Sequence, residues 1–194
     1  NKIPREDIFL ISKVNNCNQG YEKTITSFEE SLQKLQTDYL DAFLVHWPGQ
    51  DKARMLDTWK AMEHLYKEGK VKSIGVCNFE ISQLTYLLEH CEIKPMIDQV
   101  EHTPLMHDEK LISFCKEHEI QIMAWGPLLR GNLENKKIEE IAAKYNKTTA
   151  QLLLRWNIQQ EIIPIPKSKN EQRLQQNIDV FDFKRRYGRV KSYE

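Results

Sequence analysis

Residues 38–48 read DYLDAFLVHWP, in which four consecutive apolar residues, Ala42–Val45, lead directly to His46 and Trp47. A continuous apolar run, without alternation, is typical of a parallel strand that is covered on both faces. Parallel strands of this kind are joined by helices that pack on the sheet. The stretch therefore predicts a strand over Ala42–Trp47 and an α/β fold around it.

The same pattern recurs along the chain, with helical patterns between the apolar runs. Tyr21, Ile25 and Phe28, for example, follow the three- and four-residue spacing of an amphipathic helix. No Gly/Ser-rich linker divides the chain, so we predict one domain over residues 1–194. The six predicted strands are Ile8–Val14, Ala42–Trp47, Ser73–Cys77, Met96–His102, Gln121–Trp125 and Ile162–Pro166.

Six β–α units fit either an open doubly wound sheet or a (β/α) barrel, and two features favour the barrel. No G-x-G-x-x-G follows any predicted strand, so the dinucleotide fingerprint of the open sheet is missing. Polar residues stand at the carboxyl ends of successive strands, which converge on one face of a barrel. We predict a (β/α)8 TIM barrel, of which six units are visible here. The strand-end residues are Lys13, His46, Asn78, Gln99 and Lys167.

Composition excludes several classes of partner. The chain has 28 basic and 28 acidic side chains, and this zero net charge argues against nucleic acid or an anionic membrane as a partner. Its four cysteines show no paired spacing of the metal-binding or redox kind. Free thiols are typical of a reducing compartment. We expect a cytoplasmic protein without a metal site.

Four segments, in this order and at these spacings, resemble the aldo-keto reductase family. They are PREDIFLISKV (4–14), DYLDAFLVHWP (38–48), GKVKSIGVCNF (69–79), and IPKS (165–168) followed by EQRLQQN (171–177). The resemblance implies a monomeric enzyme that reduces aldehydes or ketones to alcohols with NADPH. It also implies the site residues given below.

Lys13 and His46 match two catalytic positions of the family. Its lysine lowers the pKa of a neighbouring tyrosine, since a nearby cation stabilises the phenolate. Its histidine hydrogen-bonds the substrate carbonyl oxygen. From the residues alone, Lys13 could be a solvated strand-end lysine and His46 a core histidine. Trp47 falls at the substrate mouth, and the short polar segment 48–54 suits small polar carbonyl compounds.

Other matched positions concern the nicotinamide half of the cofactor. Asn78 and Gln99 match residues that bind the carboxamide, although Asn78 could instead cap the following helix. Cys77 stands where the family usually has serine, and a thiol is a weaker hydrogen-bonding partner. Trp125 matches an aromatic residue that stacks on the nicotinamide ring, and Leu128 lies in the loop that follows it.

The segment after the last predicted strand matches the loop and helix with which the family binds the adenosine phosphate. Lys167 and Ser168 precede a helix whose N-terminus favours phosphate, and Arg173 can present a forked guanidinium to the 2′-phosphate. The alternative is a solvated basic helix end. Gln176 and Asn177 match adenine contacts, although the family commonly has glutamate at the first of these.

The chain also departs from the family. The family's proton-donating tyrosine and its partner aspartate precede the lysine strand, and only twelve residues precede Lys13 here. A helix expected near residues 184–186 is missing as well. We expect that the polypeptide has further residues and is an active reductase. The alternatives are a fragment or pseudoenzyme that binds NADP(H) without catalysis, and an open α/β binding module.

Overall fold

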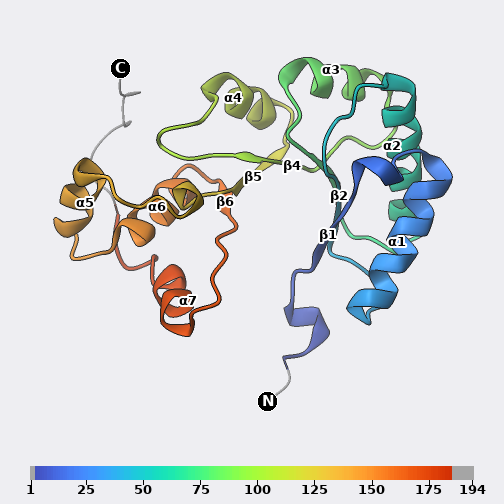
Figure 1. Cartoon of the computed structure of the whole chain (residues 1–194). Coiled ribbons are helices and arrows are strands. Elements are labelled where there is room, and N and C mark those ends of the chain that lie inside the picture. Colours follow the sequence, from blue (N-terminus) through green and yellow to red (C-terminus); the bar gives the residue numbers. More distant parts are fainter. Residues whose placement is uncertain (1–2, 185–194) are drawn as a thin grey trace. The chain divides into compact units, whose positions relative to one another are not determined.

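The structure is a computed structural model that describes residues 3–184 (Figure 1). It contains two compact units. Unit 1 takes in the chain up to Gln99 together with Phe114–Ile120, and unit 2 takes in Val100–Ser113 and the chain from Gln121 onward. The boundary crosses β4 (Ile97–Glu101) and α4 (Glu109–Glu117). The expected interruption near residues 184–186 lies at and beyond the end of the described residues.

Unit 1 is a parallel sheet with helices between its strands. Strands β1 (Ile11–Val14), β2 (Ala42–Val45), β3 (Ile74–Cys77) and β4 lie side by side in chain order. They alternate with α1 (Tyr21–Leu35), α2 (Lys52–Lys67) and α3 (Ile81–His90). Two short 3-10 helices, η1 (Arg5–Asp7) and η2 (Asn16–Asn18), flank β1. Figure 1 shows α1 and α2 next to each other beside β1 and β2.

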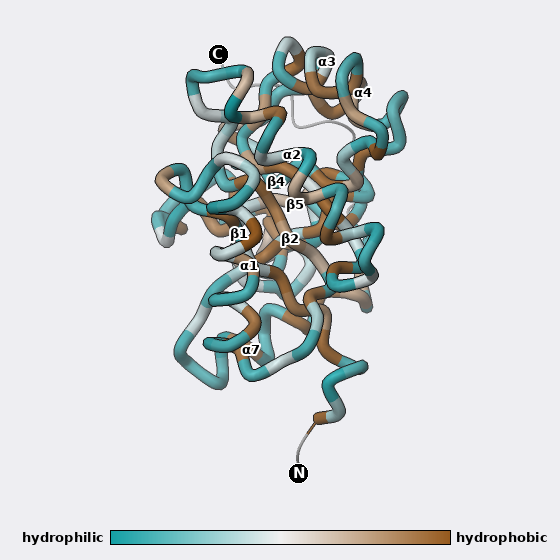
Figure 2. The backbone as a smooth tube through the Cα atoms, turned by 90° about the vertical axis from the view of Figure 1, so that its right-hand side faces the viewer, coloured by the Kyte–Doolittle hydropathy of each residue, from teal (hydrophilic) through white to brown (hydrophobic). Residues whose placement is uncertain are grey.

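The core of unit 1 follows from the apolar strands. Every residue of β2 and β3 is buried, and the tube in Figure 2 is brown along β2. Phe28 of α1 packs edge-on against Phe43 of β2, with ring centroids 5.2 Å apart. Gly75 is required in β3, because a Cβ there would lie 2.5 Å from the carbonyl oxygen of Ile97. The strands can therefore approach closely only with glycine at this position.

Unit 2 contains the remaining strands and helices. Strands β5 (Gln121–Trp125) and β6 (Ile163–Pro164) are parallel. The helices are η3 (Leu129–Gly131), α5 (Lys136–Ala143), α6 (Thr149–Ile158) and α7 (Glu171–Ile178). A buried cluster between α5 and α6 forms their core and consists of Ile138, Ala142, Leu152 and Leu153. The TxxQ pattern at the start of α6 is a capping box, in which Thr148 and Gln151 satisfy each other's backbone N–H groups.

All six predicted strands are present, and most are shorter than predicted. The first begins at Ile11 and not at Ile8, because Ile8 and Phe9 are exposed and lie outside the strand ladder. The last contracts to two residues, since Pro164 and Pro166 have no N–H to donate to a neighbouring strand. The prediction of an α/β fold is confirmed. No helix in the described part of the chain is long and apolar enough to cross a membrane.

Candidate active site

Four of the predicted site residues of unit 1 face one side of the sheet. In the parallel register, Lys13 pairs with Leu44, and Cys77 pairs with Gln99. Successive side chains of a strand alternate between faces, so Lys13, Leu44 and, two residues after Leu44, His46 share a side. Gly75 pairs with Leu44, which places Cys77 on that side too. We call this set the strand-end row; its members are Lys13, His46, Cys77 and Gln99.

The charge of Lys13 acts on its neighbours in this row. Burial lowers the pKa of His46, and the Lys13 cation lowers that pKa further. The same cation opposes the effect of burial on the Cys77 thiol, whose pKa nevertheless rises to about 12. Lys13 forms no ion pair among the residues that the structure describes. The row therefore holds an unpaired ammonium beside a neutral imidazole and a protonated thiol.

Asn78 supports the row through its backbone conformation and its amide. Its φ of 60° lies in the left-handed region, which is uncommon for a residue other than glycine. Its Nδ2 donates to the backbone oxygen of His46 at 3.3 Å. It does not cap the following helix, because Glu80 is the N-cap of α3. The alternative reading of Asn78 as a helix cap is therefore wrong.

The loop after β2 presents Trp47 at the edge of the row. Trp47 is 45% exposed, and its backbone oxygen accepts a hydrogen bond of 2.7 Å from Gln19 Nε2. Gly49, with φ of 71°, leaves room for the same glutamine, since a Cβ at Gly49 would lie 2.8 Å from Gln19 Oε1. Gln19 was not among the predicted site residues. No sequence signal identifies it, because its burial and its contact with Trp47 arise only in the folded chain.

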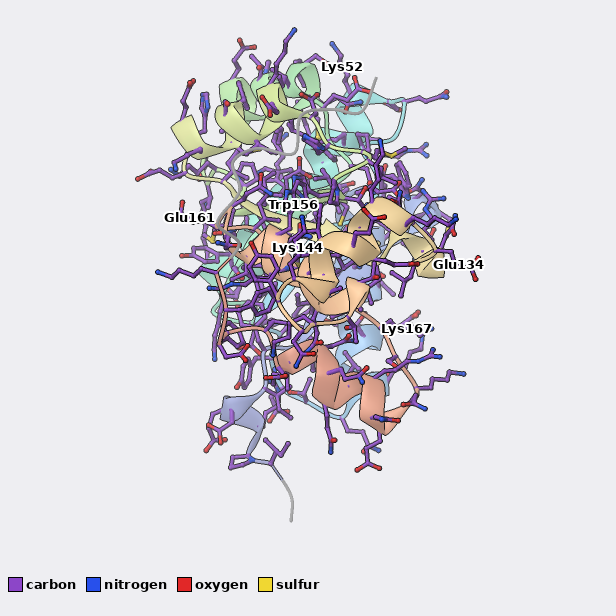
Figure 3. All side chains as sticks on the ribbon, turned by 90° about the vertical axis from the view of Figure 1, so that its left-hand side faces the viewer. Lys52, Glu134, Lys144, Trp156, Glu161 and Lys167 are labelled. Atoms are coloured by element: carbon purple, nitrogen blue, oxygen red, sulfur yellow. The ribbon has the colours of Figure 1, made fainter. Side chains whose placement is uncertain are left out.

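A cavity of about 680 Å³ lies within unit 2, on the side of Figure 3 where Glu134 and Lys167 are labelled. Six of the ten predicted cofactor-binding residues line it. These six are Leu128, Lys167, Ser168, Arg173, Gln176 and Asn177. The other four lie elsewhere: Cys77, Asn78 and Gln99 belong to unit 1, and Trp125 ends β5 without lining the cavity. The remaining lining residues come from the loop after β5, from α5 and from the start of α6.

The basic end of the cavity is built at the start of α7. Asn170 caps this helix by accepting a hydrogen bond from the Arg173 N–H at 3.0 Å. Ser168 Oγ accepts from the Asn170 N–H at 3.1 Å, which turns the chain into the helix. Lys167 and Arg173 are exposed at this end, so both cations are open to an incoming anion. A helix N-terminus with two cations and a hydroxyl is suited to bind phosphate.

The far wall of the cavity uses residues that the sequence analysis did not identify. Lys147 lines it, and its ammonium pairs with Asp179 at 2.9 Å and with Asp182 at 2.8 Å. These pairs fix the chain that follows α7 against the start of α6. Because Lys147 is already paired with two carboxylates, it contributes structure more than free charge. The capping box at Thr148 was the sequence signal for this helix start.

Comparisons with known proteins agree with this arrangement. The profile of the Aldo/keto reductase family matches residues 1–187. The chain belongs to this family. Among the solved structures, an aldo-keto reductase from a Medee basin deep-sea metagenome superposes with a TM-score of 0.91 at 44% identity, covering 94% of this chain and 68% of that one. A Bombyx mori aldo-keto reductase in complex with NADP gives a TM-score of 0.86 at 35% identity, covering 93% and 65%. These neighbours are (β/α)8 barrels, which confirms the predicted fold class.

Curated members of the aldo/keto reductase family are also similar in sequence. Glyoxal reductase of Bacillus subtilis is 50% identical over 182 residues, which are 93% of this chain and 65% of the relative. The 9,11-endoperoxide prostaglandin H2 reductase of Trypanosoma cruzi is 50% identical over 186 residues, covering 94% and 65%. The chain thus spans about two thirds of the length of these relatives.

Proposed function

We propose that this chain serves the NADPH-dependent reduction of an aldehyde or ketone to an alcohol. One observation carries the proposal: a single chain combines a strand-end row that holds Lys13 beside a neutral His46 with a cavity that is basic at the start of α7. The row supplies groups that act on a carbonyl oxygen. The cavity supplies groups that hold a nucleotide phosphate.

The cavity fits the adenosine end of NADPH in size and in charge. Its volume of about 680 Å³ falls in the range of small-molecule and cofactor sites. Lys167, Ser168 and Arg173 would hold the 2′-phosphate, with the guanidinium offering two parallel hydrogen bonds. Gln176 and Asn177 come about one helical turn after Arg173 in α7, so the three side chains lie on the same face of the helix. The adenine of a cofactor whose 2′-phosphate is bound at Arg173 would therefore lie beside the side-chain amides of these two residues.

The strand-end row fits the chemistry of carbonyl reduction. Bound NADPH supplies a hydride from its nicotinamide ring to the carbonyl carbon. The neutral imidazole of His46 donates a hydrogen bond to the carbonyl oxygen, which withdraws electron density from the carbon and fixes its orientation. Negative charge grows on that oxygen during reduction, and the Lys13 cation stabilises it. Asn78 and Gln99 would hold the carboxamide of the nicotinamide.

Proton donation is not assigned to a residue of this chain. The family resemblance expects a tyrosine beside the lysine, whereas described tyrosines such as Tyr39 contact other residues. The Tyr39 ring, for example, lies 4.0 Å from the guanidinium carbon of Arg5 and 4.3 Å from Lys72 Nζ. The proposal therefore gives this chain two tasks, which are orientation of the carbonyl and binding of the cofactor.

Small α-dicarbonyl compounds are the proposed substrates. Relatives named glyoxal reductase and methylglyoxal reductase share 50% and 41% of their aligned residues with this chain. The exposed indole of Trp47, whose backbone oxygen accepts a hydrogen bond from Gln19, offers an apolar edge next to His46. We also propose that the protein is a monomer and that it is cytoplasmic; its four free cysteines are in keeping with the second point. Size-exclusion chromatography and cell fractionation test these two points.

Replacement of His46 by alanine tests the proposed function. We expect glyoxal turnover with NADPH to fall at least about a hundredfold, because one preorganised donor to the oxygen is lost. The affinity for NADPH should stay within about twofold, since His46 lies outside the cavity. His90→Ala, at the exposed end of α3, is the matched control and should keep full turnover. If His46→Ala turns over normally, the role of His46 is wrong; NADPH binding without any turnover by the unaltered protein would favour the inactive alternative.

A further inference from the structure

One wall of the cavity is a loop with an unusual backbone. Residues 126–135 connect β5 to α5, and Leu128, Gly131 and Leu133 of this loop line the cavity. Leu129 and Arg130 both have positive φ, at 53° and 54°. Side chains other than glycine are crowded in this left-handed region, so two in succession require contacts that hold them there.

Arg130 provides such contacts on the outer side of the loop. Its Nε donates to Glu101 Oε1 at 2.9 Å, and its Nη2 donates to Glu101 Oε2 at 2.5 Å. Its guanidinium carbon lies 5.1 Å from the centre of the Trp125 ring. Glu101 ends β4 and Trp125 ends β5, so a single side chain ties the loop to two strand ends within unit 2. The forked pairing fixes the orientation of the guanidinium as well as its position.

The leucines hold the loop on its other side. Leu128, Leu129 and Leu133 pack against the core between α5 and α6. The backbone hydrogen bonds of the loop are local; the N–H of Gly131, for instance, donates to the oxygen of Leu128 at 2.9 Å. Local bonds of this kind shape a turn but do not fix it to the sheet. Among the residues described, Arg130 is the polar side chain of the loop that reaches the strand ends.

We propose that Arg130 is a positioning residue of the cavity, which holds the loop 126–135 in place through Glu101 and Trp125 and thereby slows the release of NADPH. The inference rests on the proposed function, since it takes NADPH as the ligand. Arg130 is not assigned as a phosphate ligand, because both of its outward hydrogen bonds go to Glu101 and it does not line the cavity.

Two single variants separate positioning from direct binding. Arg130→Ala removes the tie, and Glu101→Gln weakens it while leaving the guanidinium free. If Arg130 positions the loop, both variants should speed NADPH dissociation, by about three- to fivefold given that the guanidinium is largely exposed. The double variant should be no faster than the faster single one, because both changes break the same contact. If Arg130 bound a phosphate directly, Glu101→Gln would leave dissociation unchanged or slow it.

The dissociation rate is measured by stopped-flow displacement, with the fluorescence of bound NADPH as the signal and the 194-residue chain as the protein. Lys136→Ala, an exposed cation at the start of α5, is the matched control and should dissociate at the unaltered rate. Arg130→Lys keeps the charge but loses the fork, so its rate should fall between those of arginine and alanine. Additive effects, or an unchanged rate in Glu101→Gln, would overturn the proposal.

A second measurement does not depend on NADPH. Amide hydrogen exchange of residues 128–134 should quicken in Arg130→Ala and in Glu101→Gln, and stay unchanged in Lys136→Ala. Equal exchange in all proteins would overturn the positioning role. Failure of the unaltered chain to bind NADPH would instead refute the proposed function, and the exchange result would still decide whether Arg130 holds the loop.

Discussion

Asp98 and Gln99 are neighbours in β4, yet their side chains face opposite sides of the sheet. Gln99 belongs to the strand-end row, whereas Asp98 pairs in register with Val76 and is fully buried. Neither carboxylate oxygen of Asp98 has a hydrogen-bond partner of normal length among the described residues. Burial raises the pKa of Asp98 to about 8, and the nearby N–H of Phe79 offsets this only in part. Asp98 is therefore largely protonated in the folded protein at neutral pH.

Replacement of Asp98 by asparagine should change how stability depends on pH. The folded-state pKa lies above the unfolded one of about 4, so the folded protein binds an additional proton between pH 4 and pH 8. Stability is therefore lost as the pH rises through this window, by at most roughly 5 kcal/mol. Asp98→Asn should remove this loss. We expect the free energy of unfolding to rise at pH 8 and to change little at pH 5, measured by urea denaturation.

Asp41 is the matched control, because it is a buried carboxylate in the opposite situation. It accepts hydrogen bonds from Arg5, Lys72 and the Leu10 N–H, and these outweigh burial and lower its pKa. The stabilisation of the fold by the Asp41 carboxylate is present above the unfolded pKa of Asp41 and is lost only at acid pH. Asp41→Asn should therefore destabilise the protein at pH 8. If both variants shift stability in the same direction at pH 8, the assignment for Asp98 is wrong.

Among the elements, α7 shows how a short helix can organise one end of a cavity. It is only eight residues long and none of them is buried, so packing contributes little to its stability. The side-chain cap from Asn170 to the Arg173 N–H therefore matters more than it would in a core helix. The same cap orders the turn of the helix from which Arg173 reaches the basic end of the cavity.

Removal of the Asn170 cap should weaken cofactor binding. An N-cap contributes about 1 kcal/mol to a helix start, so we expect Asn170→Ala to bind NADPH about fivefold more weakly. Asn170→Ser keeps an oxygen that can accept the Arg173 N–H and adds no charge. It should bind NADPH nearly as well as the unaltered chain does in fluorescence titration. Equal affinities for the alanine and serine variants would show that the cap plays no part.

Elements also show where sequence reasoning succeeded and where it stopped. Unbroken apolar runs such as Ala42–Val45 predicted the strands, because parallel strands covered on both faces leave little choice of residue. Strand ends were predicted less well, since they depend on hydrogen bonds to residues far along the chain. The Arg130–Glu101 contact joins residues 29 apart through a loop with left-handed backbone, and no periodicity in the sequence indicates it.

Across the whole molecule, the sequence predicted which residues lie close together. It was less reliable for the contacts that each of these residues makes. Six of the ten predicted cofactor-binding residues line one cavity, and the row of unit 1 follows from strand register alone. Gln19 and Lys147 were missed, because their importance lies in contacts with Trp47 and with Asp179 that only the fold creates. The prediction of a single domain stays a prediction.

We propose that this chain binds NADPH through its 2′-phosphate, and titration with both cofactors tests this proposal. Fluorescence titration of the 194-residue chain with NADPH and NADH, repeated with Arg173→Ala, gives four dissociation constants. We expect NADPH to bind at least about tenfold more tightly than NADH, as a forked, charge-assisted contact allows. Arg173→Ala should remove most of this difference by weakening NADPH alone. Equal affinity for the two cofactors in the unaltered chain, or equal losses in the variant, would show that Arg173 does not bind the 2′-phosphate.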